Sequence, residues 1–163
     1  MKKNSKYRQG VFNPVNKEKY KGSFPIYFRS SYELKFQRWA DANPNVLSWG
    51  SESVVIPYQN PLTGRISRYF VDFNVTMRDK NGELKKFLIE IKPFSQTLPP
   101  VQKNKKTKSL IYQQAEYVKN QAKWAAAESW SKNHNCQFVV ITEKQLGLRR
   151  LDSTLRMKEH KNS

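Results

Sequence analysis

The chain has 163 residues, enough for one domain with a real core, and its 37% hydrophobic content with four Trp, eight Tyr and nine Phe indicates a folded protein rather than a disordered one. A net charge of +17 is best explained by a polyanionic partner, and nucleic acid fits better than an anionic membrane surface because no long basic amphipathic helix is evident. A single cysteine excludes an intrachain disulfide, and with only two histidines the chain cannot form a zinc site of the usual kind. No apolar run reaches membrane-spanning length and no signal peptide is visible. We therefore expect an intracellular soluble protein, or part of a particle assembled there.

Residues 1–25 are predicted to form an irregular basic arm. Their Lys and Arg outnumber the single acid, Glu18, and glycine and proline interrupt any periodicity. Such an arm would contact phosphates or another protein, although its first ten residues are equally consistent with a solvated terminus.

A helix is predicted from Ser30 to about Asn43, where Pro44 follows. Its apolar residues recur close to a helical period: Tyr32, Phe36 and Trp39. Glu33 completes a Ser-x-x-Glu capping box with Ser30, in which its side chain satisfies a backbone donor at the start of the helix.

Three short segments follow this helix. We expect a bend over residues 45–49, a short strand over residues 53–58 and a turn over residues 59–64. Pro57 has no N–H group, so it would end the pairing of the short strand or confine that strand to an edge. Glu52 is interpreted as a surface group at the end of the strand.

A β-hairpin is predicted from Arg68 to Lys92. Two runs of aromatic and β-branched residues, 69–75 and 86–92, flank an Asn-Gly turn signal. Ionisable residues interrupt both runs, with Asp72 in the first and Glu90 and Lys92 in the second. Burying an unpaired carboxylate is costly, so these residues are expected to act together at one site.

The register of the hairpin indicates which of these residues face one another. If residues 80–82 form a three-residue loop with Gly82 in the left-handed conformation, Asp79 faces Glu83 and Asp72 faces Glu90. Lys92 then emerges on the same face as Glu90. Two opposed carboxylates repel unless a divalent cation lies between them, and a loop one residue longer or shorter would separate them. The alternative is an edge strand whose Glu and Lys prevent aggregation.

The segment after Lys92 is predicted to be a long basic loop beside this site. Its lysines are candidates for contact with nucleic acid: Lys103, Lys105, Lys106 and Lys108. A second helix is predicted from about Leu110 to Lys132, with an apolar stripe at four-three spacing: Ile111, Ala115, Val118, Ala122, Ala125 and Ser129. Asn120, Gln121 and Lys123 lie off that stripe, either lining the cleft or, for at least two of them, facing solvent.

The last predicted strand, residues 136–142, is a continuous apolar run of the kind buried on both faces. Residues 148–163 are predicted to be a basic tail with room for a short helix. We therefore expect one domain over residues 26–147, with no repeats.

The combination of Asp72 with Glu90-Ile91-Lys92 resembles the signature of the PD-(D/E)XK nuclease superfamily, although Val71 stands where the superfamily name has Pro. The predicted order αβββαβ is that of the restriction-endonuclease-like core, an α/β (α+β) fold with a mixed central sheet flanked by helices. Several segments also resemble the head completion nucleases of T-even-type phages and, more distantly, the catalytic domain of TnsA-type transposon endonucleases: residues 27–33, 43–46, 55–58, 69–73, 89–93, 123–124 and 138–143.

The resemblance implies a metal-dependent DNA endonuclease that uses Mg²⁺, with Mn²⁺ as a substitute. Asp72, Glu90 and the Ile91 carbonyl would hold the metal, Glu33 would complete its shell or bind a second ion, and Lys92 would orient the attacking water. Arg29 and Lys123 join the four loop lysines as candidate DNA contacts. The implied role is to process or hold packaged DNA ends during virion assembly in the host cytoplasm, with head, portal or neck proteins as partners. The alternative is a structural head-assembly protein that binds DNA without turnover.

Overall fold

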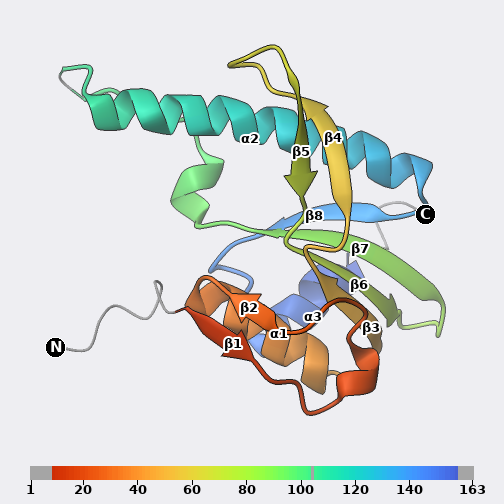
Figure 1. The fold of residues 1–163 in the computed structure, drawn as a ribbon. Coiled ribbons are helices and arrows are strands. Elements are labelled where there is room, and N and C mark those ends of the chain that lie inside the picture. Colours follow the sequence, from red (N-terminus) through yellow and green to blue (C-terminus); the bar gives the residue numbers. More distant parts are fainter. Residues whose placement is uncertain (1–8, 104, 158–163) are drawn as a thin grey trace, which may run out of the picture.

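The computed structural model describes residues 9–103 and 105–157, so Lys2, Lys3, Lys6 and Arg8 of the predicted basic arm lie outside the described residues, as does the end of the predicted tail. In chain order the elements, which include two short 3-10 helices (η), are β1 (Gly10–Phe12), η2 (Lys17–Lys19), β2 (Ile26–Phe28), α1 (Ser31–Ala42), β3 (Val46–Ser51), β4 (Val55–Gln59), β5 (Ile66–Phe70), β6 (Phe73–Arg78), β7 (Leu84–Ile91), η3 (Phe94–Thr97), α2 (Lys108–Asn133), β8 (Gln137–Ile141) and α3 (Leu148–Met157) (Figure 1).

The centre of the fold is a four-stranded sheet in the order β3-β6-β7-β8. The first three strands pair antiparallel, and β7 and β8 pair parallel, so the sheet is mixed. Helices α1 and α3 with the β1–β2 ribbon cover one face, and α2 with the β4–β5 ribbon covers the other (Figure 1). This is the predicted α/β architecture of the restriction-endonuclease-like fold, a mixed central sheet flanked by helices.

Two hydrophobic clusters lie on the two faces of the sheet because strand side chains alternate. Phe87 and Ile89 of β7 point into the larger cluster, under α1 and α3. Leu88 points into the smaller one, under α2, where Tyr69 and Phe138 also pack. The alternation therefore directs Glu90, two residues after Leu88, toward the α2 side of the sheet.

The segments next to the two ends of the chain are packed rather than irregular. Phe12 and Tyr20, within the predicted basic arm, are buried in the larger cluster. Leu151 and Leu155, within the predicted tail, are fully buried in the same cluster as part of α3. The core thus extends on both sides of residues 26–147, because the charged residues that dominate these segments are spaced between apolar ones.

The first strand of the central sheet is β3, which corrects the prediction of a bend over residues 45–49. A short segment with Asn and Ser has weak strand propensity of its own. It becomes a strand because it pairs with β6, with a bulge between Val46 and Ser48. The strand predicted over residues 53–58 is β4, which lies outside the central sheet and pairs only with β5; Pro57 accordingly sits in an edge strand, as predicted.

Helix α2 packs with a different face from the predicted one. Ile111 and Val118 of the predicted apolar stripe are 50% and 45% exposed, whereas Asn120 and Ala127 on the opposite face are buried. The apolar pattern does not select this face, because alanines are compatible with either face and the polar Asn120 belongs to the buried one. None of the helices in the described ranges is long and apolar enough to cross a membrane.

Candidate active site

The β6–β7 hairpin has the predicted register. Strand pairs run from Phe73 and Ile89 at one end to Arg78 and Leu84 at the other. The Asp79 N–H group donates to the Glu83 carbonyl at 2.8 Å, and Gly82 has a positive φ of 79°. One step beyond the last pair, the same register brings Asp72 opposite Glu90. The turn chemistry alone therefore fixed which two acids meet.

Asp72 lies at a point where the chain changes sheets, not within a strand as predicted. Strand β5 ends at Phe70 in the outer ribbon and β6 begins at Phe73 in the central sheet. The backbone at this junction is held by a bond from the Glu52 N–H group to the Asp72 carbonyl, 3.0 Å. The Ile91 N–H group donates to Asp72 Oδ2 at 2.8 Å, which orients the carboxylate toward the end of β7.

The two opposed carboxylates are electrostatically strained. Desolvation raises the pKa of Asp72 well above its usual value, and the charge of the nearby Glu90 raises it further. The hydrogen bond from the Ile91 N–H group acts in the opposite direction and lowers this pKa. Burial also raises the pKa of Glu90, while a hydrogen bond from Tyr69 and the charge of Lys92 oppose that rise. A site that holds two such groups side by side favours a bound cation at neutral pH.

Tyr69 is part of the site, and sequence reasoning missed it. Its hydroxyl donates a short hydrogen bond of 2.5 Å to Glu90 Oε2, and both residues are buried. Burial and the Glu90 charge both raise the pKa of the Tyr69 hydroxyl, so it remains a donor. The sequence offers no spacing signal for this contact, because Tyr69 belongs to β5, in a different sheet from Glu90.

Two lysines approach Glu90 from different elements. Lys92 Nζ lies 3.7 Å from Glu90 Oε1, on the predicted face at the end of β7. Lys123 of α2 places Nζ 5.5 Å from the ring centre of Tyr69 and 5.9 Å from that of Tyr58. Burial lowers the pKa of Lys123, and neighbouring Lys119 adds to this, while attraction to Glu90 opposes it. Lys123 thus lines the site, whereas Gln121 is exposed.

Glu33 takes part in the cap at the start of α1, where Ser30 is the N-cap residue. Its backbone N–H group donates to Ser30 Oγ at 3.1 Å, and its carboxylate accepts from the Arg29 N–H group at 2.9 Å, a variant of the predicted capping box. Burial raises the pKa of Glu33, and its charge raises that of Asp72, so the two carboxylates interact. Both predicted roles of Glu33, capping and metal binding, are compatible with this position.

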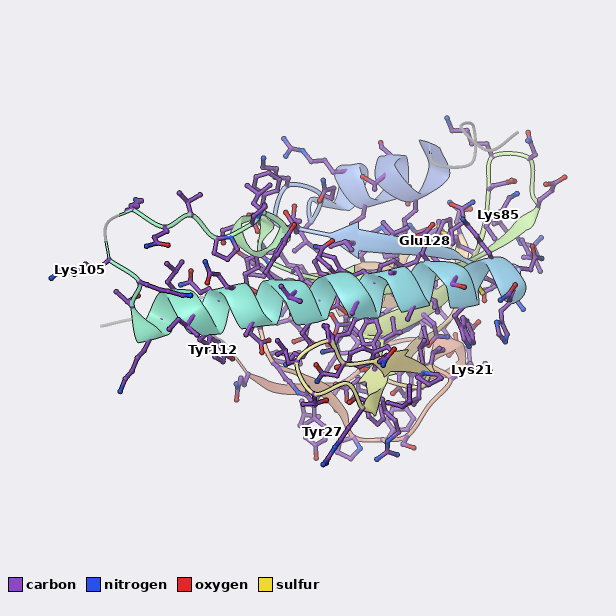
Figure 2. All side chains as sticks on the ribbon, turned by 90° about the horizontal axis from the view of Figure 1, so that it is seen from above. Lys21, Tyr27, Lys85, Lys105, Tyr112 and Glu128 are labelled. Atoms are coloured by element: carbon purple, nitrogen blue, oxygen red, sulfur yellow. The ribbon has the colours of Figure 1, made fainter. Side chains whose placement is uncertain are left out.

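The predicted DNA contacts fall on two sides of the site. Arg29 pairs with Glu52 at 3.0 Å beside Glu33. Three of the four predicted loop lysines are exposed on the segment leading into α2: Lys103, Lys105 and Lys106. Lys108 is also exposed, but it is the first residue of α2 rather than part of the loop. Figure 2, looking down on α2, shows Lys105 on that segment and Tyr112 near the same end of the helix.

The carboxylates suit a hard divalent cation with few protein ligands. Within the described ranges, no three His, Cys, Asp or Glu side chains gather closely enough to form a metal site by themselves. Mg²⁺ is usually held by one or two carboxylates together with water and substrate phosphates, so the Asp72–Glu90 pair fits it. The hairpin register, which sets the two carboxylates opposite each other at the end of β7, is the observation that supports this fit.

Comparison with known proteins agrees with this geometry. The TnsA-like endonuclease N terminal family matches residues 43–143, a range that contains Asp72, Glu90 and Lys92. The chain is also 38% identical over 147 residues to the head completion nuclease of Enterobacteria phage T4, covering 87% of this chain and 94% of that protein. No solved structure matches the chain. The chain therefore belongs to the TnsA-like endonuclease family, among nucleases of the restriction-endonuclease-like type.

Proposed function

We propose that this protein is a Mg²⁺-dependent DNA endonuclease that processes or secures packaged DNA ends during the completion of phage heads. The observation that carries the proposal is the register of the β6–β7 hairpin, which sets Asp72 against Glu90 with Lys92 beside them. The similarity to a head completion nuclease supports the role in head assembly. That role would be carried out in the host cytoplasm, with head, portal or neck proteins as partners and with the mature particle as a further location.

Asp72 and Glu90 would hold the metal, with the Ile91 carbonyl as a further ligand and Glu33 completing the shell or binding a second ion. Mn²⁺ would substitute for Mg²⁺ because both accept oxygen ligands. When bound, the ion would supply Lewis-acid polarisation of the scissile phosphate and a more acidic water.

The residues of the chain have distinct tasks around that centre. The Ile91 N–H group and the Tyr69 hydroxyl fix one oxygen each of Asp72 and Glu90, so the remaining oxygens are held ready as ligands. Lys92 would orient the attacking water and offset the charge that develops on the phosphate. Lys123 would add a second positive charge from α2, on the side where DNA approaches.

The proposal is tested by cleavage of supercoiled plasmid and of linear duplex in Mg²⁺, with EDTA and with a Glu90→Ala variant. We expect nicking or shortening in Mg²⁺ that EDTA and Glu90→Ala both abolish. Glu83→Ala is the matched control, because Glu83 is an exposed acid on the same hairpin, away from the site. Activity that survives Glu90→Ala would place the chemistry elsewhere.

A Lys92→Ala variant separates catalysis from binding. We expect it to lose cleavage and to keep its affinity for DNA, since the loop lysines and Arg29 remain. Loss of both together would mean that Lys92 is only a phosphate contact. Intact binding by the wild type without cleavage of any DNA would favour the structural head-assembly role instead.

A further inference from the structure

A cavity of about 560 Å³ opens directly beside Lys92, between the segment that follows β7 and the first half of α2. Lys92 forms part of its wall, together with Leu98 and Pro100 on one side and Tyr112, Tyr117 and Asn120 on the other. The two carboxylates of the proposed active site do not line it. The cavity is therefore a neighbouring site that a substrate bound at Lys92 would reach.

Asn120 indicates that the cavity receives a polar ligand. Its side chain is only 5% exposed, and no hydrogen bond of its amide is found among the residues that the structure describes. The amide atoms of Asn120 are not sealed off in the core, so they face the open space of the cavity. Because Asn120 lines the cavity, its amide can donate a hydrogen bond to a ligand there and accept one from it. The edge of a nucleobase offers groups of both kinds.

Tyr112 gives the cavity a stacking surface. It is 67% exposed although it is a large aromatic residue, and it forms part of the cavity wall. Exposed aromatic side chains beside a basic segment are the usual platform on which unpaired bases stack. Ile111, its neighbour in the chain, is similarly exposed and does not line the cavity.

The charges around the cavity suit a nucleic acid strand. The acid in its wall, Glu116, is ion-paired with Lys119 at 2.7 Å. A second cavity of about 590 Å³ shares Gln113 with the first and is lined by Lys103 and Lys105. A strand that placed one base beside Asn120 could thus continue past these lysines, which would contact its phosphates.

We propose that this cavity holds an unpaired nucleotide next to the scissile phosphate, so that the enzyme prefers DNA whose strand is unpaired on one side of the cut, as in a fork, flap or gap. The inference rests on the proposed function, because it assumes that Lys92 faces the scissile phosphate. The volume fits one nucleotide, whereas a base within a continuous duplex stays stacked and cannot enter a pocket.

The test measures binding in EDTA, so that it does not depend on cleavage. Fluorescence anisotropy compares a forked DNA with a blunt, fully paired duplex of the same length, and 2-aminopurine at the first unpaired position of the fork reports stacking. The proteins are the wild type, Tyr112→Ala, Asn120→Ala and the control Ile111→Ala.

We expect the wild type to bind the fork at least about tenfold more tightly than the duplex and to change the 2-aminopurine fluorescence. Tyr112→Ala should weaken fork binding roughly 5- to 150-fold, as loss of one base–aromatic stack does, and Asn120→Ala should reduce the same preference. Ile111→Ala should leave it unchanged.

Equal binding of fork and duplex by the wild type would overturn the inference. So would a fork preference that Tyr112→Ala, a substitution at an exposed position, leaves intact. Neither result would bear on the nuclease proposal, which is tested separately by whether Glu90→Ala abolishes Mg²⁺-dependent cleavage. Conversely, fork binding through Tyr112 without any cleavage would refute the nuclease proposal alone.

Discussion

Replacing Asp72 by Asn is expected to stabilise the metal-free protein while abolishing cleavage. The Asn side chain keeps an oxygen that can accept from the Ile91 N–H group, so the local structure is preserved. The substitution removes a half-buried charge that faces Glu90. Desolvation and the charge of Glu90 are the two causes that raise the pKa of Asp72. Active-site groups that are arranged for function in this way commonly cost the fold stability.

The pH dependence of this effect follows from linkage, because folding raises the pKa of Asp72. Replacing a residue whose arrangement costs the fold stability commonly gains about 0.5–2 kcal/mol, and we expect Asp72→Asn to gain about 1–2 kcal/mol. For a domain of this size that is an increase in Tm of roughly 2–8 °C. A carboxyl group whose pKa is raised by folding destabilises the folded state only at pH values above its pKa in the unfolded chain. The gain in stability should therefore be larger at pH 8 than at pH 4.5, and it should shrink as the pH falls toward about 4.

The assay is thermal unfolding in EDTA at pH 8 and at pH 4.5, for the wild type and the variant. Asp41→Asn provides a control of opposite sign, because Asp41 accepts the N–H groups of Val15 and Asn16 at 2.8 and 2.9 Å. An Asn there can accept only one of them, and we expect a loss of about 1–3 kcal/mol. A lower Tm for Asp72→Asn in EDTA at pH 8, or a gain of equal size at both pH values, would refute the reasoning.

Two further substitutions test the surroundings of the site, and a third tests the core on the other face of the sheet. Tyr69→Phe removes the donor to Glu90 Oε2 and should raise the Mg²⁺ concentration for half-maximal cleavage by about 10- to 100-fold; an unchanged titration would show that Tyr69 only packs. Glu33→Gln keeps an acceptor for the Arg29 N–H group, so it should retain the Tm and lose cleavage, whereas full activity would leave Glu33 with its capping role alone. Leu155→Ala should lower the free energy of unfolding in urea by about 2–5 kcal/mol, and a change below about 1 kcal/mol would contradict the placement of α3 in the core.

The features that could be predicted from the sequence depend on local chemistry. The Asn-Gly turn sets the hairpin register, and alternation from that turn brings Asp72 opposite Glu90 and Lys92 onto the same face. The α1 cap at Ser30 follows from a motif four residues long. In each case the interacting groups are close in the chain or joined by one turn, so counting residues is sufficient.

The features that could not be predicted depend on contacts between distant segments. Strand β3 exists because β6 pairs with it, and Tyr69 reaches Glu90 because the chain changes sheets between Phe70 and Phe73. The buried face of α2 is set by the ribbon and sheet beneath it rather than by its own alanines. A polar residue such as Asn120 is not expected on a buried helix face from the sequence alone. Asn120 is nevertheless buried, and it lines the cavity beside Lys92.

The link between β7 and β8 has a consequence for biosynthesis. The Lys92 N–H group donates to the carbonyl of Ile141 at 2.9 Å, and this parallel pairing follows a helix of 26 residues. Leu151 and Leu155, still later in the chain, close the cluster beneath the sheet. A growing chain on the ribosome therefore carries both acids and the lysine long before they are fixed in place. Pairing over such a separation is slow, so the candidate site would be assembled only after β8 and α3 have left the ribosome.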